Sequence, residues 1–178
     1  MCDFRKLNDM VLASLPFVEE WSRVQAHRDQ LEVALAGVAA LMLAVGSQYN
    51  HSLLAVLCSV AGHVLAAGDP DAGDLSPANW VPARAHPCSV ITWVLSLTQA
   101  QAHLLAFQLA AALEMVSQWI MADSTLIGPE ARLTFRHLKT VLFDILVPVR
   151  LAAGGQAAES LFSNLPSHEC QATDQARA

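Results

Sequence analysis

The chain has 178 residues, of which 54% are hydrophobic and 15% charged, and its formal net charge at pH 7 is −6. Soluble domains average about 25% charged residues, so this composition favours membrane contact or unusually extensive burial. Nucleic-acid binding needs lysine and arginine clustered on one face, whereas the basic residues here are scattered without a run. The composition therefore argues against a nucleic-acid partner, and the length is sufficient for one domain with its own core.

Residues 1–32 are predicted to form an amphipathic helix. Val11, Leu15, Val18 and Trp21 recur at helical spacing and make one apolar stripe, which faces either a protein core or a membrane surface. Pro16 is expected to mark a break, or the first turn of a helix over 17–30, because proline is unfavourable inside a helix. The segment lacks the apolar stretch of a cleavable signal, so an internal segment is expected to supply any membrane targeting.

Residues 33–68 contain no Asp, Glu, Lys or Arg. Two apolar arms, VALAGVAALMLAVG and LLAVLCSVAGHVLAAG, are joined by the polar string SQYNHS. Each arm is about 15 residues long and rises about 22 Å as a helix, less than the hydrocarbon core of about 30 Å. The arms therefore predict a hairpin that enters a membrane from one side and returns. The alternative is two buried helices of a soluble bundle.

Residues 69–87 are predicted to be a loop because they contain four prolines. A second hairpin is predicted over about 88–152, where two apolar stretches flank a charged turn. Pro129 suits the first turn of a helix, and Pro148 is expected to end or kink that helix. Residues 163–178 are polar and predicted to be a disordered tail. Residues 1–162 are accordingly predicted to be a single all-α membrane-hairpin domain.

The ionisable residues contain no recognisable catalytic or metal-binding set. The four cysteines form no C-x-x-C pair, which favours a reducing compartment. The histidines make no H-E-x-x-H motif and the serines no G-x-S-x-G motif. No catalytic residue, cofactor or metal is therefore predicted, and the chain is not expected to be an enzyme. Glu114 and Asp144 interrupt apolar stretches, which leaves open a small channel or transporter subunit if they lie in a membrane.

Three strings, in this order, resemble the receptor expression-enhancing protein family, the endoplasmic-reticulum-shaping proteins that include the yeast Yop-type members. HRDQLEVALAGVAALMLAVG is similar to the family's first apolar arm, HLKTVLFDILVP to its L-K-T segment that ends in proline, and GGQAAESLF to its glycine-rich ending. The family's Tyr-Pro-x-Tyr motif is replaced here by SVAGHVL. The residues that carry the resemblance are Arg28, Leu35, Gly37, Leu41, Leu43, Gly46, Leu53, Leu54, Glu114, Leu138, Lys139, Thr140, Pro148, Gly154, Gly155, Leu161 and Phe162.

The resemblance implies an integral membrane protein of the endoplasmic reticulum that inserts wedge-like hairpins and stabilises curved tubules. It also implies homo-oligomers, or association with other hairpin proteins, with the lipid bilayer as the main partner. The wedge itself is predicted from the length of the arms. The alternative function is a soluble all-α interaction or adaptor domain without catalytic activity, whose uncharged helices form a buried core.

Overall fold

The computed structural model describes residues 4–45, 52–67, 90–123 and 125–154. Within these segments the chain forms six helices and no strand, which confirms the predicted all-α fold. The predicted loop over 69–87 and the predicted tail over 163–178 lie outside them. The helices are α1 (Phe4–Trp21), α2 (Gln25–Val45), α3 (Ser52–Ala66), α4 (Val90–Ser96), α5 (Gln99–Met121) and α6 (Pro129–Ala153).

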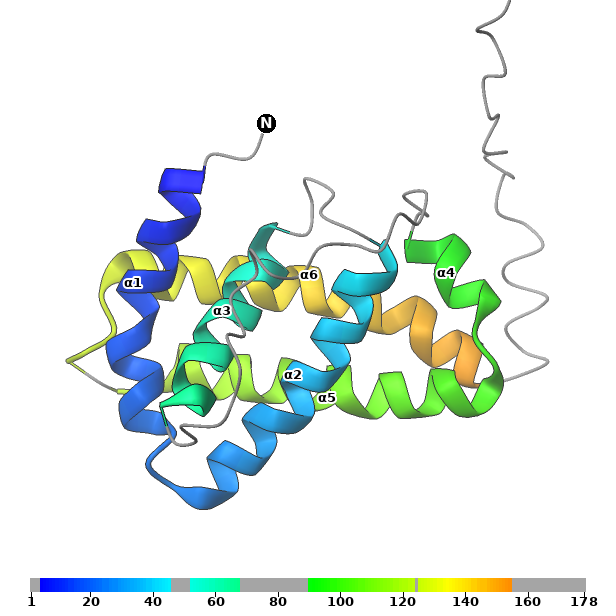
Figure 1. Cartoon of the computed structure of the whole chain (residues 1–178), viewed down its shortest axis with the longest axis horizontal. Helices are drawn as coiled ribbons and strands as arrows, with labels where there is room; N and C mark the ends of the chain where they lie inside the picture. The colour runs from blue at the N-terminus through cyan, green and yellow to red at the C-terminus, as the bar shows by residue number, and fades with distance from the viewer. Residues whose placement is uncertain (1–3, 46–51, 68–89, 124, 155–178) are drawn as a thin grey trace, which may run out of the picture.

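The helices are arranged around an antiparallel pair, α5 and α6, which make the most extensive contact in the bundle. Figure 1 shows this pair running side by side, with α1, α2 and α3 lying across it and α4 near one end. α2 packs on α5, while α1, α3 and α4 each contact α6. The result is a two-layer bundle in which one side of the α5–α6 pair is covered by the other helices.

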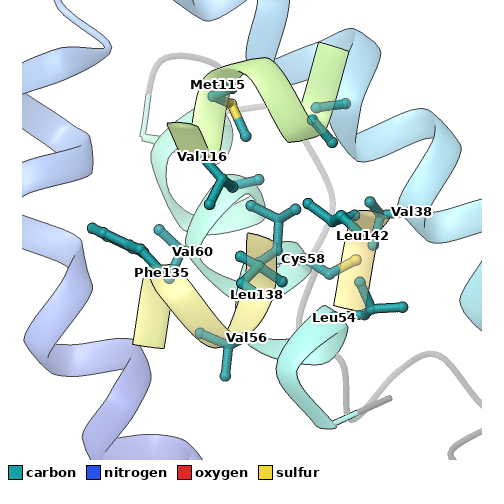
Figure 2. Packing of buried hydrophobic residues seen from close by; sticks show 14 of the residues in the cluster. Val38, Leu54, Val56, Cys58, Val60, Met115, Val116, Phe135, Leu138 and Leu142 are labelled. Atoms are coloured by element: carbon teal, nitrogen blue, oxygen red, sulfur yellow. The ribbon is translucent and has the colours of Figure 1, made fainter. Parts of the chain in front are cut away.

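α3 is the most enclosed helix of the bundle. Every residue from Leu54 to Gly62 is buried, and so is Val64, because α1, α2 and α6 surround the helix. Figure 2 shows the side chains of Leu54 and Cys58 beside Val38 and Leu142. The second apolar arm therefore turns its hydrophobic side chains toward protein on almost all sides.

α1 and α2 meet near an aromatic cluster at one end of the bundle. Trp119 of α5 is 1% exposed, and its ring contacts those of Phe17, Trp21 and Phe135 at centroid distances between 5.0 and 6.5 Å. His27 stacks on Trp21 at 4.2 Å, and its Nδ1 lies 2.8 Å from the Trp21 carbonyl oxygen. These contacts fix the turn between α1 and α2 against the α5–α6 pair.

The prediction that Pro16 breaks the first helix is wrong, because Pro16 lies inside α1. Its missing N–H would have bonded the carbonyl of Leu12, four residues earlier. Leu12 and Pro16 are both exposed, so water can satisfy that carbonyl and the helix continues to Trp21. The expected helix over 17–30 is instead divided between α1 and α2 at residues 22–24.

α6 begins as the sequence predicts, with Pro129 in its first turn after the N-cap Gly128. It does not end at Pro148, which lies inside the helix and is half-buried. α6 ends at Ala153, and the N–H of Gly154 donates to the carbonyls of Arg150 and Leu151 at 3.0 and 3.1 Å. The carbonyl that Pro148 leaves without a donor belongs to the exposed Asp144, so solvent can hydrate it.

The predicted hairpin boundaries are met only in part. The first apolar arm is the C-terminal two thirds of α2, which begins at Gln25 rather than at 33. The second arm corresponds to α3, and α2 and α3 pack against each other. The segment 88–152 contains three helices, α4, α5 and α6, rather than two arms of one hairpin.

Candidate interaction surface

The antiparallel alignment of α5 and α6 is fixed by hydrogen bonds at both ends of the pair. At one end, Gln99 Nε2 donates to the Ala153 carbonyl at 3.2 Å. At the other end, the Arg132 guanidinium donates to the carbonyls of Ile120 and Ala122 at 2.9 and 3.4 Å. These bonds place Phe107 level with Val147, and Ala110 level with Phe143, along the two helices.

The start of α5 is fixed separately by a capping box. The backbone N–H of Gln101 donates to Thr98 Oγ1 at 3.2 Å, and the backbone N–H of Thr98 donates to Gln101 Oε1 at 2.9 Å. Two of the unpaired donors at the helix start are thus satisfied. The cap and the Gln99 bond together hold the first turn of α5 in place against the end of α6.

The side of the α5–α6 pair that faces away from α1, α2 and α3 is rich in exposed apolar residues. On α5, Phe107 is 65% exposed and Met121 is 81% exposed. On α6, Phe143 is 55% exposed and Val147 is 44% exposed. Helical spacing places the residues of each helix on the same side. We call this surface the outer face and define it by Phe107, Glu114, Met121, Arg136, Lys139, Phe143, Val147 and Arg150.

The charges of the outer face are divided unequally between its two helices. α5 carries one charged residue, Glu114, whose Oε1 accepts a hydrogen bond from Gln118 Nε2 at 3.4 Å. α6 contributes the exposed cations Arg136, Lys139 and Arg150, and the exposed acid Asp144 lies at the margin of the face beside Phe143. Within the described segments, none of these three cations makes an ion pair. The outer face is therefore apolar along α5 and mainly cationic along α6, where three cations outnumber one acid.

The residues that carry the family resemblance are not gathered at one site. Gly37, Leu41, Leu54 and Leu138 are buried, which makes their role structural. Leu35, Leu53 and Pro148 are half-buried, and Leu43, Glu114, Lys139, Thr140 and Gly154 are exposed. Of these, Glu114 and Lys139 belong to the outer face. Gly46, Gly155, Leu161 and Phe162 lie outside the described residues.

Three of these residues have specific structural contacts. Arg28 Nη2 donates to the Leu65 carbonyl at 3.5 Å, near the C-terminal end of α3. Gly37 lies where α2 crosses α5, and a Cβ atom there would be 2.5 Å from the Cβ of Gln108. Gly37 thus permits a close approach of the two helices. Thr140 Oγ1 donates to the Arg136 carbonyl one turn earlier, at 3.2 Å.

The polar groups inside the bundle offer little chemistry. The described residues contain no group of three or more His, Cys, Asp or Glu side chains that could hold a metal ion. Cys58 is buried, and desolvation raises the pKa of its thiol well above the ordinary value. The Trp119 indole N–H is buried and has no acceptor among the residues that the structure describes. Both side chains contribute to the packing of the bundle interior.

The sequence pattern alone does not identify the exposed apolar residues of the outer face, Phe107, Met121, Phe143 and Val147. They stand in apolar stretches whose composition does not separate inward from outward positions. Their helical positions do carry a signal, because Phe107 and Glu114 are seven residues apart and share one face of α5. An exposed acid on an apolar helix therefore marks which face of that helix is uncovered.

α5 is, among the described residues, the one helix long and apolar enough to cross a membrane, and 33% of its most apolar window is buried. The core helix of a soluble protein passes the same test. Comparisons of the chain with protein-family models, with curated proteins and with solved structures find no match.

Proposed function

We propose that the chain is a non-catalytic all-α interaction domain that binds its partner through the outer face of α5 and α6. The observation that carries this proposal is the exposure of Phe107 and Phe143, at 65% and 55%, on neighbouring helices. Exposed aromatic side chains gathered on one surface mark interaction sites in soluble proteins. The bonds at both ends of the α5–α6 pair hold that surface in a fixed shape.

The burial of the two apolar arms supports the same proposal. Leu41 of α2 and Leu54 of α3 are both 0% exposed. In a membrane hairpin these side chains would face lipid, whereas here they face neighbouring helices. Burial against other helices is a sufficient environment for these two leucines, which supports the interaction domain.

A second candidate is the membrane-shaping function, in which two hairpins insert into the endoplasmic reticulum and stabilise curved tubules. The length and apolar character of α5 support it. In that function the bundle opens, the apolar arms exchange helix contacts for lipid, and homo-oligomers or other hairpin proteins are the partners. The two candidates therefore differ in what the arms contact.

Purification without detergent tests the proposed interaction domain. We expect a monodisperse protein by size-exclusion chromatography with light scattering, and a cooperative thermal transition by circular dichroism. Carbonate extraction of membranes from cells that express the chain tests the opposing candidate, the membrane-shaping function. Retention in the carbonate-washed pellet, together with aggregation in the absence of detergent, would favour the membrane-shaping function over the interaction domain.

A photo-crosslinking amino acid at position 107 tests the binding surface itself. We expect cross-links in cells from position 107 on α5 and from position 143 on α6. Position 12 on α1 is the matched control, because Leu12 is 56% exposed and lies outside the outer face. Equal cross-linking from position 12 would show that exposure alone, rather than this surface, determines the contacts.

A further inference from the structure

We infer that the partner of the outer face is the surface of an anionic lipid bilayer, to which the folded bundle binds peripherally. This inference rests on the proposed interaction domain and names its partner. It differs from the membrane-shaping function because the apolar arms stay in the core and only outer-face side chains enter the interface.

The cations of α6 form one stripe with its exposed apolar residues. Positions 136, 139, 143, 147 and 150 follow one another at three- and four-residue steps, which keeps them on one side of the helix. The stripe reads Arg, Lys, Phe, Val, Arg, and all five side chains are exposed. Basic residues beside aromatic and aliphatic ones are typical of helices that lie in a membrane interface, where cations contact anionic headgroups.

α5 supplies the apolar half of the same surface. Its exposed positions include Phe107 and Met121, and Glu114 is the one charged residue of the whole helix. Because Phe107 lies level with Val147 and Ala110 lies level with Phe143, the exposed aromatic rings stand on two adjacent ridges. A bilayer interface offers both the apolar layer that these rings require and the negative charge that α6 requires.

The charge distribution disfavours a second copy of the chain as the occupant. A two-fold interface places the same patch on both partners, so the cationic stripe would face either itself or an α5 that carries a single acid, Glu114. A bilayer that contains phosphatidylserine provides many negative charges instead. The chain has a net charge of −6, so binding to such a bilayer requires a local cationic surface such as this stripe.

Vesicle flotation tests the inference with purified full-length protein. The probes are vesicles of phosphatidylcholine alone and vesicles in which about a third of the lipid is phosphatidylserine. We expect flotation with the phosphatidylserine vesicles at low salt, release at high salt and release by carbonate. Each cation near the surface contributes about a fivefold change in affinity, so Arg136→Gln/Lys139→Gln/Arg150→Gln should weaken binding about a hundredfold.

Two further variants separate the outer face from general charge and from folding. Arg5→Gln/Lys6→Gln/Arg23→Gln changes the net charge by the same amount, on α1 and in the turn that follows it, and should float like the wild type. Phe107→Ser/Phe143→Ser should lose flotation while its thermal transition stays close to that of the wild type, because both rings are already exposed. Equal loss in the two charge variants would overturn the assignment to the outer face.

The remaining outcomes distinguish the inference from the function on which it rests. A monodisperse, cooperatively folding chain that does not float overturns lipid binding and leaves the interaction domain intact. Flotation that resists carbonate, from a chain that aggregates without detergent, overturns both. A concentration-dependent dimer that is lost in Phe107→Ser/Phe143→Ser, without flotation of the wild type, assigns the outer face to a second copy and overturns the lipid surface.

Discussion

α3 and α5 are both apolar helices, yet they are buried to different extents. α3 is 15 residues long and is enclosed by α1, α2 and α6, so that its surface from Leu54 to Gly62 is buried on all sides. α5 is 23 residues long, and its buried residues follow one stripe from Ala102 to Trp119, whereas Phe107 and Met121 face away from the bundle. Hydropathy thus identifies both helices as apolar. Only their contacts show that α3 is a core helix and that α5 has an exposed apolar side.

The largest expected effect comes from a charge placed in α3. Leu54 is 0% exposed, so Leu54→Asp removes about 1.5–3 kcal/mol of hydrophobic stabilisation and buries an unpaired carboxylate that costs about 3–5 kcal/mol. Domains are stable by about 5–15 kcal/mol, so the variant should be largely unfolded. The loss of the cooperative thermal transition, followed by circular dichroism, measures this.

The control for that variant lies in the same helix. His63 is exposed, so His63→Asp should change the free energy of unfolding by less than about 1 kcal/mol. If Leu54→Asp folded as stably as His63→Asp, α3 would not be the enclosed helix of the bundle. Retention of the wild type in the carbonate-washed membrane pellet, and loss of that retention in Leu54→Asp, would instead support inserted hairpins.

A second contrast lies within α5, between its buried and exposed sides. Trp119 is 1% exposed and contacts three aromatic rings, whereas Met121 is 81% exposed. Trp119→Ala should cost about 3–5 kcal/mol because it leaves a large cavity, and Met121→Ala should cost less than about 0.5 kcal/mol. Chemical denaturation with urea gives both values.

Trp119→Phe refines this contrast. The substitution retains an aromatic ring and removes an indole N–H that has no acceptor in the described residues. An unsatisfied buried donor costs about 1–3 kcal/mol, so its removal offsets part of the lost packing. We expect Trp119→Phe to destabilise the protein much less than Trp119→Ala. Equal losses for the two variants would show that ring shape, rather than burial of an aromatic group, holds this end of the bundle.

The sequence predicted the helical class because its apolar residues recur at helical spacing and its breaks coincide with polar or proline-rich strings. Pro129 was assigned correctly to a helix start, since its position follows from local backbone geometry alone. Pro16 was expected to break α1, and Pro148 to end or kink α6, yet both helices continue past these prolines, because both missing hydrogen bonds fall at exposed residues whose carbonyls water can satisfy. Whether proline ends a helix therefore depended on tertiary exposure, which the local sequence does not contain.

The candidate surface was harder to predict than the fold. Arg136, Lys139 and Arg150 are separated in the sequence by apolar residues, so they form no charge run that composition reveals. They become a stripe only when α6 is a continuous helix through Pro148, and Phe107 joins them only through the antiparallel pairing of α5 with α6. The arms of residues 33–68, by contrast, were recognised as apolar, but sequence alone left open whether lipid or protein covers them.

A smaller effect is expected where α2 crosses α5. Gly37→Ala gains about 1 kcal/mol of helix propensity but places a Cβ atom 2.5 Å from the Cβ of Gln108. Overpacking of this kind costs about 1–3 kcal/mol, and the Gln108 Cβ cannot move without its backbone. The net loss should therefore be at most about 2 kcal/mol, measured by urea denaturation.

The exposed Ala36 isolates the propensity term in the same helix. Ala36→Gly should lower the free energy of unfolding by about 1 kcal/mol, because glycine disfavours the helix. At this exposed position the substitution relieves no close contact that could offset the loss. If Gly37→Ala stabilised the protein by as much as Ala36→Gly destabilises it, the added Cβ atom would cost nothing, and α2 and α5 would have to separate easily. The close crossing would then contribute nothing to the rigidity of the outer face.

The smallest expected effect concerns the enclosure of α3 and is visible only in alkaline solution. Burial raises the pKa of the Cys58 thiol, whereas in the unfolded chain that pKa is about 8.5. Above that value the unfolded state binds fewer protons than the folded state. Stability is therefore fully retained below about pH 8.5 and lost as pH rises toward the folded pKa, by at most about 1.4 kcal/mol per pH unit.

Cys58→Ala isolates this proton, because every other titrating group is common to both proteins. The free energy of unfolding, measured by urea denaturation from pH 7 to pH 10, should fall more steeply for the wild type than for Cys58→Ala. Below about pH 8 the difference between the two should be constant, because Cys58 is then protonated in both states of the wild type. Parallel curves up to pH 10 would mean that water reaches the thiol, and α3 would then resemble α5 in having a side open to solvent.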